Sequence, residues 1–368
     1  MKLSVIILNY NVRHFLELCL RSVCAAVNDL DAEIIVVDNQ STDDSCLMVK
    51  SLFPEVVLIE NVNYYGFSIG NNIGVEVAKG DYLCILNPDT VVSENTFSSL
   101  LKFADQKREI GIVGCRLIDG QGRFLPESKR HIPTPWVAIK KILGWSKTYY
   151  ASEVNEIDTG PVAVFVGAFM LLKKDIYNAV GGFDEDYFMY GEDIDLSYKI
   201  LKAGYNNYYV GQSSIIHYKG ESTLKDKSYA KRFYGAMQIF YDKHFKSNFI
   251  FDTLVWIGIR VARLTSPKDE KQDRITGQYI LVSSKQHPSL ESALDAPVEL
   301  ITDLKTYNNK TEYILDNNYL DFNSIIEILS KAPKNSSATF KILPKNSNFI
   351  IGSNSSKQRG EVLSFVNN

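Results

Sequence analysis

The stretch EIIVVDNQSTDDS, residues 33–45, is a continuous apolar run that ends in an aspartate and a cluster of Ser, Thr and Asp. Such a run is typical of a strand buried on both faces of a parallel sheet. Similar runs recur on either side of it, with helical stretches between them. The expected strands are 4–8, 33–37, 56–60, 82–86 and 110–115, and the expected helices are 13–27, 42–52, 67–78 and 93–105. This alternation predicts βαβ units and a parallel α/β sheet.

Polar residues stand at the carboxyl ends of the predicted strands. They are Asn9, Asp38, Asn61, Asn87 and Asp89. Ligands of open α/β sheets bind outside this edge, in the crevice beyond the strand ends. The sequence therefore predicts a binding site there, with two acidic residues in it.

The overall composition excludes several classes of protein. The 368 residues carry a formal net charge of −3, so no nucleic-acid partner is expected. The N-terminal run MKLSVIILNYN lacks the apolar length and the cleavage site of a signal peptide, and we interpret it as the first strand. No window reaches the roughly 18 apolar residues of a spanning helix. The five cysteines form no CxxC pair, which favours free thiols in a reducing compartment. A cytoplasmic protein is expected.

The chain divides by composition into three expected parts. Residues 1–227 hold the α/β pattern, with two short strands expected late in it, at 208–210 and 214–218. Residues 228–274 form a connector rich in aromatic and basic side chains. Its run FIFDTLVWIGIRVARL either lies in a membrane interface or packs as a helix between the domains. Residues 275–368 predict a small α/β accessory domain to which the sequence assigns no chemistry.

Two motifs follow the early strands and have both a functional and a structural interpretation. Asp38 can accept hydrogen bonds from a base or ribose, or it can serve a turn or helix cap. In NVNYYGFSIGNNIGVEVAKG, residues 61–80, Gly66 permits a close backbone approach, and Asn71 is unusual within a helix. This segment either binds polar ligand groups or forms an Asn-rich turn and cap.

The motif LNPDT, residues 86–90, is a candidate metal site. A hard cation such as Mg²⁺ or Mn²⁺ needs one or two protein carboxylates when substrate phosphates complete its shell, so Asp89 alone is chemically sufficient. A Pro-Asp turn is the structural alternative. His217, on the apolar run SSIIHYKG, either completes the metal shell or is a buried core histidine.

Acidic residues cluster at a helix start in MYGEDIDLSYKI, residues 189–200. Glu192, Asp193 and Asp195 suit the positive end of a helix dipole. One of these carboxylates can instead act as a general base on a hydroxyl, with mutual repulsion raising its proton affinity.

The order of these motifs resembles that of the family-two inverting glycosyltransferases. The series is VIILNYN, VVDNQSTDDS, GFSIGNN, LNPDT, VGAFMLLKKD, GGFDEDYFMYGEDIDLSYKI and IIHYKG, over roughly residues 1–245. The nearest likeness is to the bacterial branch that includes rhamnosyltransferases of cell-surface polysaccharide assembly. The resemblance implies a GT-A fold, a Rossmann-like three-layer α/β/α sandwich that binds nucleoside-diphospho-sugars.

The resemblance also implies roles for individual residues. The expected donor-binding residues are Asn9, Asp38, Asn63, Gly66, Asn71, Asn87 and Asp89. Asp89 and His217 would hold Mg²⁺ or Mn²⁺, Gly167, Ala168 and Glu192 would face the acceptor, and Asp193 would be the catalytic base. Family members often carry two acidic residues in the metal motif. Here Asn87 replaces the first, so metal binding depends more on Asp89 and His217.

The expected activity is transfer of a sugar, with inversion, from a UDP- or dTDP-sugar to a hydroxyl of a saccharide or lipid-linked saccharide. Peripheral association with the inner face of the cytoplasmic membrane fits such an acceptor. A homodimer or a partner enzyme would give the accessory domain a role. The alternatives are a nucleotidyltransferase, which lacks its Gly-rich loop here, and a non-catalytic sugar-nucleotide or glycan-binding protein on a decayed scaffold. A hydride-transfer enzyme lacks its dinucleotide fingerprint here.

Overall fold

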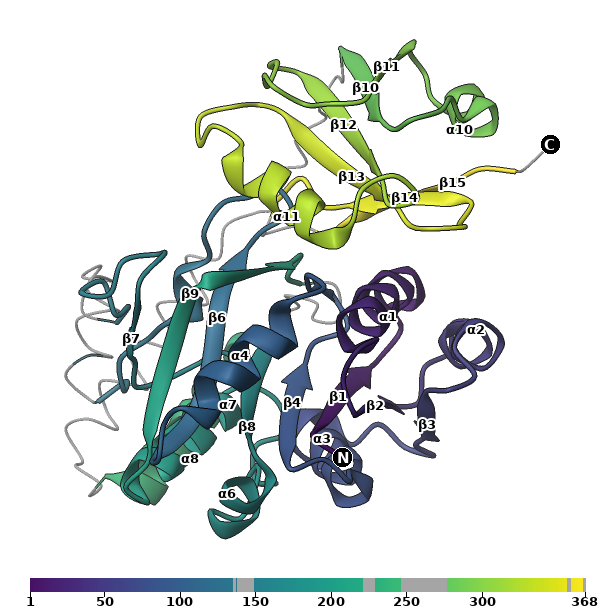
Figure 1. Ribbon diagram of the computed structural model, residues 1–368. Coiled ribbons are helices and arrows are strands. Elements are labelled where there is room, and N and C mark those ends of the chain that lie inside the picture. Colours follow the sequence, from purple (N-terminus) through teal and green to yellow (C-terminus); the bar gives the residue numbers. More distant parts are fainter. Residues whose placement is uncertain (135–136, 138–148, 221–228, 246–276, 356–358, 367–368) are drawn as a thin grey trace.

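A computed structural model describes residues 1–134, 137, 149–220, 229–245, 277–355 and 359–366 (Figure 1). Two sheets organise these residues. The larger one has the strand order β3-β2-β1-β4-β8-β6-β9-β5, with β7 paired to β9, and the smaller one has the order β11-β10-β12-β13-β14-β15. The second sheet lies above the first in Figure 1 and belongs to the C-terminal part of the chain.

The expected strands of the first 120 residues form the parallel core of the larger sheet. They are β1 (Leu3–Asn9), β2 (Ala32–Asp38), β3 (Val57–Glu60), β4 (Tyr82–Leu86) and β6 (Ile110–Ile118). β1 pairs in parallel with both β2 and β4. The remaining strands are β5 (Thr90–Val91), β7 (Thr159–Pro161), β8 (Phe169–Lys173) and β9 (Asn206–His217). β9 is a single strand where the sequence predicted two short ones, because β6 follows it across a register irregularity.

Helices cover both faces of this sheet. Val5 and Ile7 of β1 pack toward α1 (Arg13–Val27), α2 (Ser45–Leu52) and α4 (Thr96–Asp105). The intervening Ile6 packs toward α3 (Gly66–Val77), α6 (Lys174–Ala179) and α7 (Glu192–Lys202). Because successive side chains of a strand point to opposite faces, a continuous apolar run supplies both cores. The three-layer α/β/α sandwich of the GT-A type is confirmed.

The C-terminal part forms the expected second, smaller α/β unit. Its strands are β10 (Gln278–Val282), β11 (Val298–Ile301), β12 (Thr311–Asp316), β13 (Thr339–Leu343), β14 (Phe349–Gly352) and β15 (Glu361–Ser364). The first four are parallel, and β14 and β15 join them in antiparallel pairing. The helices are α10 (Pro288–Ala293) and α11 (Phe322–Lys331).

The connector lies largely outside the described residues. Of residues 228–274 the structure describes α8 (Tyr229–His244) and the residue after it, and the whole run FIFDTLVWIGIRVARL is outside the description. α8 packs its aromatic side chains against α7 and Tyr187. In the part of the chain that is described, no helix combines the length and the apolar character needed to cross a bilayer. Cys19, Cys84 and Cys115 are buried free thiols, and Cys24 and Cys46 are half-buried.

The two sheets meet through a shared hydrophobic core and a close backbone approach. α11 lies on the side of the smaller sheet that faces the larger one (Figure 1), and Leu329 of this helix is buried. The turn after β6 presses against it: Gly122 has φ +77°, and a Cβ at this position would overlap the Leu329 carbonyl oxygen.

Replacing Gly122 with alanine is therefore expected to loosen the junction. Gly122→Ala adds backbone strain and a steric clash, and should lower the free energy of unfolding by about 3 kcal/mol. Gly204→Ala is the matched control, because Gly204 has φ +92° but no neighbouring atom within 4 Å of the position that a Cβ would take. Only the strain of about 1 kcal/mol applies there. Equal losses in urea denaturation would contradict the close approach.

Candidate active site

A cavity of about 400 Å³ opens at the carboxyl edge of the central strands. Several sequence-predicted residues line it together, drawn from strand ends, from the loop before β8 and from the start of α7. They are Gly66, Asn87, Gly167, Ala168, Glu192 and Asp193. Aromatic and charged side chains complete the wall, namely Tyr10, Tyr64, Phe67, Tyr149, Tyr150, Tyr190, Phe233, Glu127, Arg130 and Lys219. The acceptor and base candidates thus face one space, beside the turn of the metal motif.

The start of α7 enters this cavity through two left-handed residues. Tyr190 has φ +72° and Gly191 has φ +82°, which turns the chain sharply before Glu192. The preceding loop is docked on the start of α3, where the Phe67 amide donates to the Phe188 carbonyl at 2.9 Å. Gly66, at φ +77°, allows that approach, because any Cβ there would overlap the same carbonyl.

Asp193 is held in place by a buried ion pair. Arg130 Nη2 donates to Asp193 Oδ2 at 2.6 Å, and the Gly167 amide donates to the same oxygen at 3.2 Å. Oδ1 accepts the Ile194 amide at 2.8 Å. Burial alone would lower the pKa of Arg130, but the charges of Asp193 and Tyr149, together with the hydrogen bonds to both, raise it. The carboxylate therefore has a fixed orientation, with spare acceptor capacity on Oδ1.

Glu192 is the second carboxyl group in the cavity wall. It is buried, and its Oε2 has no hydrogen-bond partner among the described residues. Burial, and after it the charge of Asp193, raises the pKa of Glu192 well above its ordinary value of 4.5. The third acid of the cluster, Asp195, lies outside the cavity lining, with Oδ1 2.6 Å from His244 Nε2 and Oδ2 3.1 Å from Lys199 Nζ. Two acids of the cluster, Glu192 and Asp193, thus line the cavity, and the third lies outside it.

Asp89 and His217 lie side by side just behind the cavity wall. β5 pairs with β9 so that Thr90 is opposite His217, and Asp89 Oδ1 lies 3.4 Å from His217 Nε2. Both side chains are buried, and neither Asp89 Oδ1 nor His217 Nδ1 has a hydrogen-bond partner among the described residues. Asn87 Nδ2 is 3.5 Å from His217 Nε2. Orphaned buried oxygen and nitrogen atoms of this kind fit a cation site.

Asn9 and Asp38 form a network behind the strand ends. Asn9 Nδ2 donates to Asp38 Oδ1 at 2.7 Å, and the Ser41 amide donates to Asp38 Oδ2 at 2.8 Å. Asp38 thus supports the turn after β2, while the adjacent Asn39 lines the cavity and accepts the Tyr65 amide at 3.1 Å. Both Asn9 and Asp38 are buried outside the cavity lining.

The other two predicted donor residues lie apart from the cavity lining. Asn63 is exposed, with its amide 3.4 Å from the Tyr65 hydroxyl. Asn71 is buried within α3, donates to the Phe67 carbonyl at 2.9 Å, and keeps an oxygen with no hydrogen-bond partner in the described part of the chain. The cavity thus brings Glu192 and Asp193 together with Asn87 of the metal motif, whereas Asn63 and Asn71 lie outside its lining.

Comparison with known proteins identifies the family. Residues 4–181 match the sequence profile of Glycosyl transferase family 2. The chain is 30% identical over 224 residues to rhamnosyltransferase WbbL of Escherichia coli (strain K12), covering 58% of this chain and 82% of that protein. This chain belongs to glycosyl transferase family 2. The resemblance expected from the motif order is confirmed.

Two further comparisons of this family 2 glycosyltransferase give a second similar sequence and a similar solved structure. It is 27% identical over 241 residues to the N-acetylglucosaminyl-diphospho-decaprenol L-rhamnosyltransferase of Mycobacterium tuberculosis (strain ATCC 25618 / H37Rv), covering 61% of this chain and 78% of that one. A solved mannosyltransferase, PcManGT from Pyrobaculum calidifontis in complex with GDP-Man and Mn²⁺, is 17% identical, with a TM-score of 0.48 over 72% of this chain and 70% of that one.

Several residues of the cavity carry no local signal in the sequence of this transferase. Arg130 lies in a loop of turn residues, and its backbone bridges to Val164 and Tyr150 place it opposite Asp193. Lys219 is ion-paired with Glu127 in the cavity wall. Burial would raise the pKa of Glu127, yet the charge of Lys219 and the hydrogen bonds to the carboxylate together lower it. These contacts join residues that are far apart in the sequence, so local motif spacing could not predict them.

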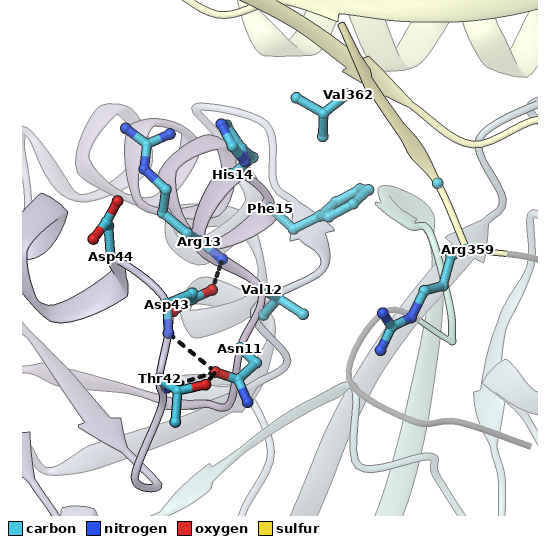
Figure 2. Close-up of a pocket in the computed structure, with 11 residues that line it drawn as sticks. Asn11, Val12, Arg13, His14, Phe15, Thr42, Asp43, Asp44, Arg359 and Val362 are labelled. Carbon is cyan, nitrogen blue, oxygen red and sulfur yellow. Dashed lines mark hydrogen bonds between the residues drawn. The ribbon is translucent and has the colours of Figure 1, made fainter. Parts of the chain in front are cut away.

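A second cavity, of about 500 Å³, lies where the C-terminal domain of the transferase meets the start of α1 (Figure 2). Arg359 and Val362 approach it from the C-terminal domain, opposite Val12. On the other side, Asn11 Oδ1 accepts the Thr42 amide at 2.7 Å. The loop that follows Asn9 and Tyr10 is therefore bordered by both domains.

The raised pKa of Glu192 generates a prediction about stability. A folded-state pKa above the unfolded value means that the native protein binds more protons between the two values, so stability falls as pH rises through that window. Glu192→Gln removes this ionisation. Its free energy of unfolding should fall less than that of the wild type between about pH 5 and about pH 8, by about 1 kcal/mol or more.

Urea denaturation of the wild type, Glu192→Gln and the control Glu76→Gln at both pH values checks this. Glu76 is exposed, so its substitution should leave the pH dependence unchanged. A wild-type pH profile retained in Glu192→Gln would refute the assignment.

Proposed function

We propose that this transferase moves a sugar, with inversion at the anomeric carbon, from a UDP- or dTDP-sugar to a hydroxyl of a lipid-linked or growing surface saccharide. The observation that carries the proposal is the placement of Asp193. Its carboxylate, fixed by Arg130, faces the same cavity as Asn87 and Pro88, the residues that lead into Asp89. A base and a diphosphate-binding edge on one cavity are what a single displacement requires.

The donor side of the proposal depends on the carboxyl edge of the sheet. Asn9, Asp38, Asn63, Gly66 and Asn71 are the proposed contacts to the nucleoside and sugar. Asp89 and His217 would hold Mg²⁺ or Mn²⁺. The described residues contain no group of three or more His, Cys, Asp or Glu side chains suited to a metal, so the diphosphate would supply much of the shell. When bound, the cation neutralises charge on the departing diphosphate.

The acceptor side depends on the start of α7 and the loop before β8. Gly167 allows the Phe67 ring and Asp193 to pack closely against the loop, since a Cβ there would lie only 3.1 Å from the Phe67 ring and 3.7 Å from Asp193 Cβ. Glu192, whose pKa is raised by burial and by the charge of Asp193, lies beside the base in the same cavity wall and is the proposed contact to an acceptor oxygen. The acceptor hydroxyl would lie against Asp193 Oδ1, the carboxylate oxygen not engaged by Arg130.

The reaction is then one concerted exchange of bonds. Asp193 takes the hydroxyl proton as the acceptor oxygen bonds to the anomeric carbon, and the bond from that carbon to the diphosphate oxygen breaks with its electron pair. Arg130 and the Gly167 amide keep the base oriented throughout.

The substrate class is proposed from the relatives. The names of two relatives specify rhamnosyl transfer, and one of them includes a decaprenol-linked acceptor. A dTDP-rhamnose donor and a lipid-linked acceptor at the inner face of the cytoplasmic membrane are therefore the first substrates to test on this chain.

Asp193→Asn is expected to lower kcat by about 10²- to 10⁴-fold while donor affinity stays near the wild-type value. Because the substitution leaves the buried Arg130 without its charge partner, stability should fall as well. The double variant Arg130→Gln/Asp193→Asn should recover much of the stability and none of the transfer. Asp186→Asn, an exposed change in the same loop, is the control.

Transfer rates, titration calorimetry with the donor and thermal melts separate the outcomes. Parallel loss of donor binding and transfer in Asp193→Asn would mean that the residue is structural. Transfer restored in the double variant would exclude Asp193 as the base.

Removing the metal is the second test of the proposed function. Chelation should weaken donor binding, because the diphosphate loses its counter-charge, and Asp89→Asn should reduce the effect of added Mn²⁺ about tenfold or more. Calorimetry with UDP-, dTDP- and GDP-sugars, with Mn²⁺ and with chelator, measures both. Donor affinity unaffected by chelator would contradict the metal site.

A further inference from the structure

We infer that the C-terminal domain is a working part of the donor site, because it fixes the strand pair that carries Asp89 and His217. This inference rests on the proposed function, since it gives Asp89 and His217 a shared ligand. It assigns a role to residues 277–355 and 359–366, for which the sequence indicated none.

β5, the strand that follows Asp89, is held in the sheet by very little pairing. β5 is two residues long and lies at the end of the strand path, paired with β9 through Thr90 and Val91. One further backbone bond, from the Tyr218 amide to the Asp89 carbonyl at 3.0 Å, continues the pairing. β9 is held in the sheet by β6, whereas β5 pairs with β9 alone, so the geometry of Asp89 against His217 depends also on the side chains packed around β5.

The C-terminal domain supplies that support through one continuous core. Val91, Ile216 and Tyr218, which flank the two proposed metal ligands, belong to the same buried cluster as α11 and strands β10, β12, β13 and β14. α1 joins the cluster, and Phe15 meets the Tyr218 ring edge-on at 5.2 Å. The apolar side chains next to Asp89 and His217 are thus buried by the second domain together with α1.

A charged contact fixes the same segment from outside. Glu94, three residues after Val91, accepts hydrogen bonds from the first amides of α11: Phe322 N at 2.8 Å and Asn323 N at 2.9 Å. A carboxylate at a helix N-terminus satisfies amides that lack helical partners and interacts favourably with the helix dipole. Glu94 is therefore a positioning residue that ties the chain after Asp89 to the C-terminal domain.

The test weakens this tie without touching the proposed ligands. Glu94→Gln removes the charge and retains the shape. It is expected to lower Mn²⁺-dependent donor affinity about fivefold and to speed amide exchange of Tyr218 by a similar factor. Binding measured with chelator should stay unchanged. Glu327→Gln, on the exposed side of α11 and paired with Lys331, is the matched control and should alter neither quantity.

Asp321→Ala provides a second variant from the other domain. Asp321 caps α11 by accepting the Ser324 amide at 2.8 Å, so its loss weakens the same helix start without altering the catalytic domain. It should change Mn²⁺-dependent affinity and Tyr218 exchange in the same direction as Glu94→Gln, which keeps the inference testable if Glu94→Gln folds poorly.

The outcomes distinguish this inference from the proposed function. Wild-type values for both readouts in Glu94→Gln and Asp321→Ala would overturn the inference and leave the transferase proposal intact. If the wild type itself binds no nucleotide sugar with Mn²⁺, the proposed function fails. Tyr218 exchange then decides alone whether the C-terminal domain fixes β5 against β9.

Discussion

The antiparallel pairing of Thr90 and Val91 with Ile216 and His217 joins two distant parts of the chain at the site. It places Asp89, in the metal motif, beside a histidine that ends a long strand from much later in the sequence. The parallel strands β1, β2 and β4 supply the opposite side, with Asn9 and Asp38 already bonded to each other. One edge of the site thus comes from strands close together in the sequence, and the other comes from β5 and β9, which are far apart in it.

Charge within the site follows the same division. Three acids cluster at the start of α7, and the structure gives each a different environment. Arg130 neutralises Asp193, His244 and Lys199 surround Asp195, and Glu192 keeps an elevated pKa. Buried charges are costly unless they are paired, so these partners determine how each buried acid is stabilised. All three acids stand in the first turn of α7, and the residues packed around each one give it a different environment.

The sequence predicted the features that local patterns control. Continuous apolar runs located β1, β2, β4 and β6, and the strand-end rule located Asp38 and Asp89, because a buried parallel strand needs apolar residues along its whole length. β5 was not predictable, since a two-residue strand has no pattern of its own. β9 was predicted as two strands because Gly211 interrupts the apolar run, yet β9 continues through it beside β6. Arg130 could not be found, because its role follows from a contact with Asp193 across the cavity.

The strand order also determines when the site can form during synthesis. β8 lies between β4 and β6 in the sheet, although it follows β6 in the chain. The first four strands can pair as they leave the ribosome, whereas β6 has its β8 neighbour only after residue 173 is made. Asp89 and His217 can come together only after residue 217 is made, and the core around them is complete only after β14 is made. Since domains fold largely as units, starting from the N-terminal side, the nascent protein carries an incomplete larger sheet from the end of β4 at residue 86 until the end of β9 at residue 217. The edge of β4 that later pairs with β8 therefore stays without its partner strand until residue 173 is made.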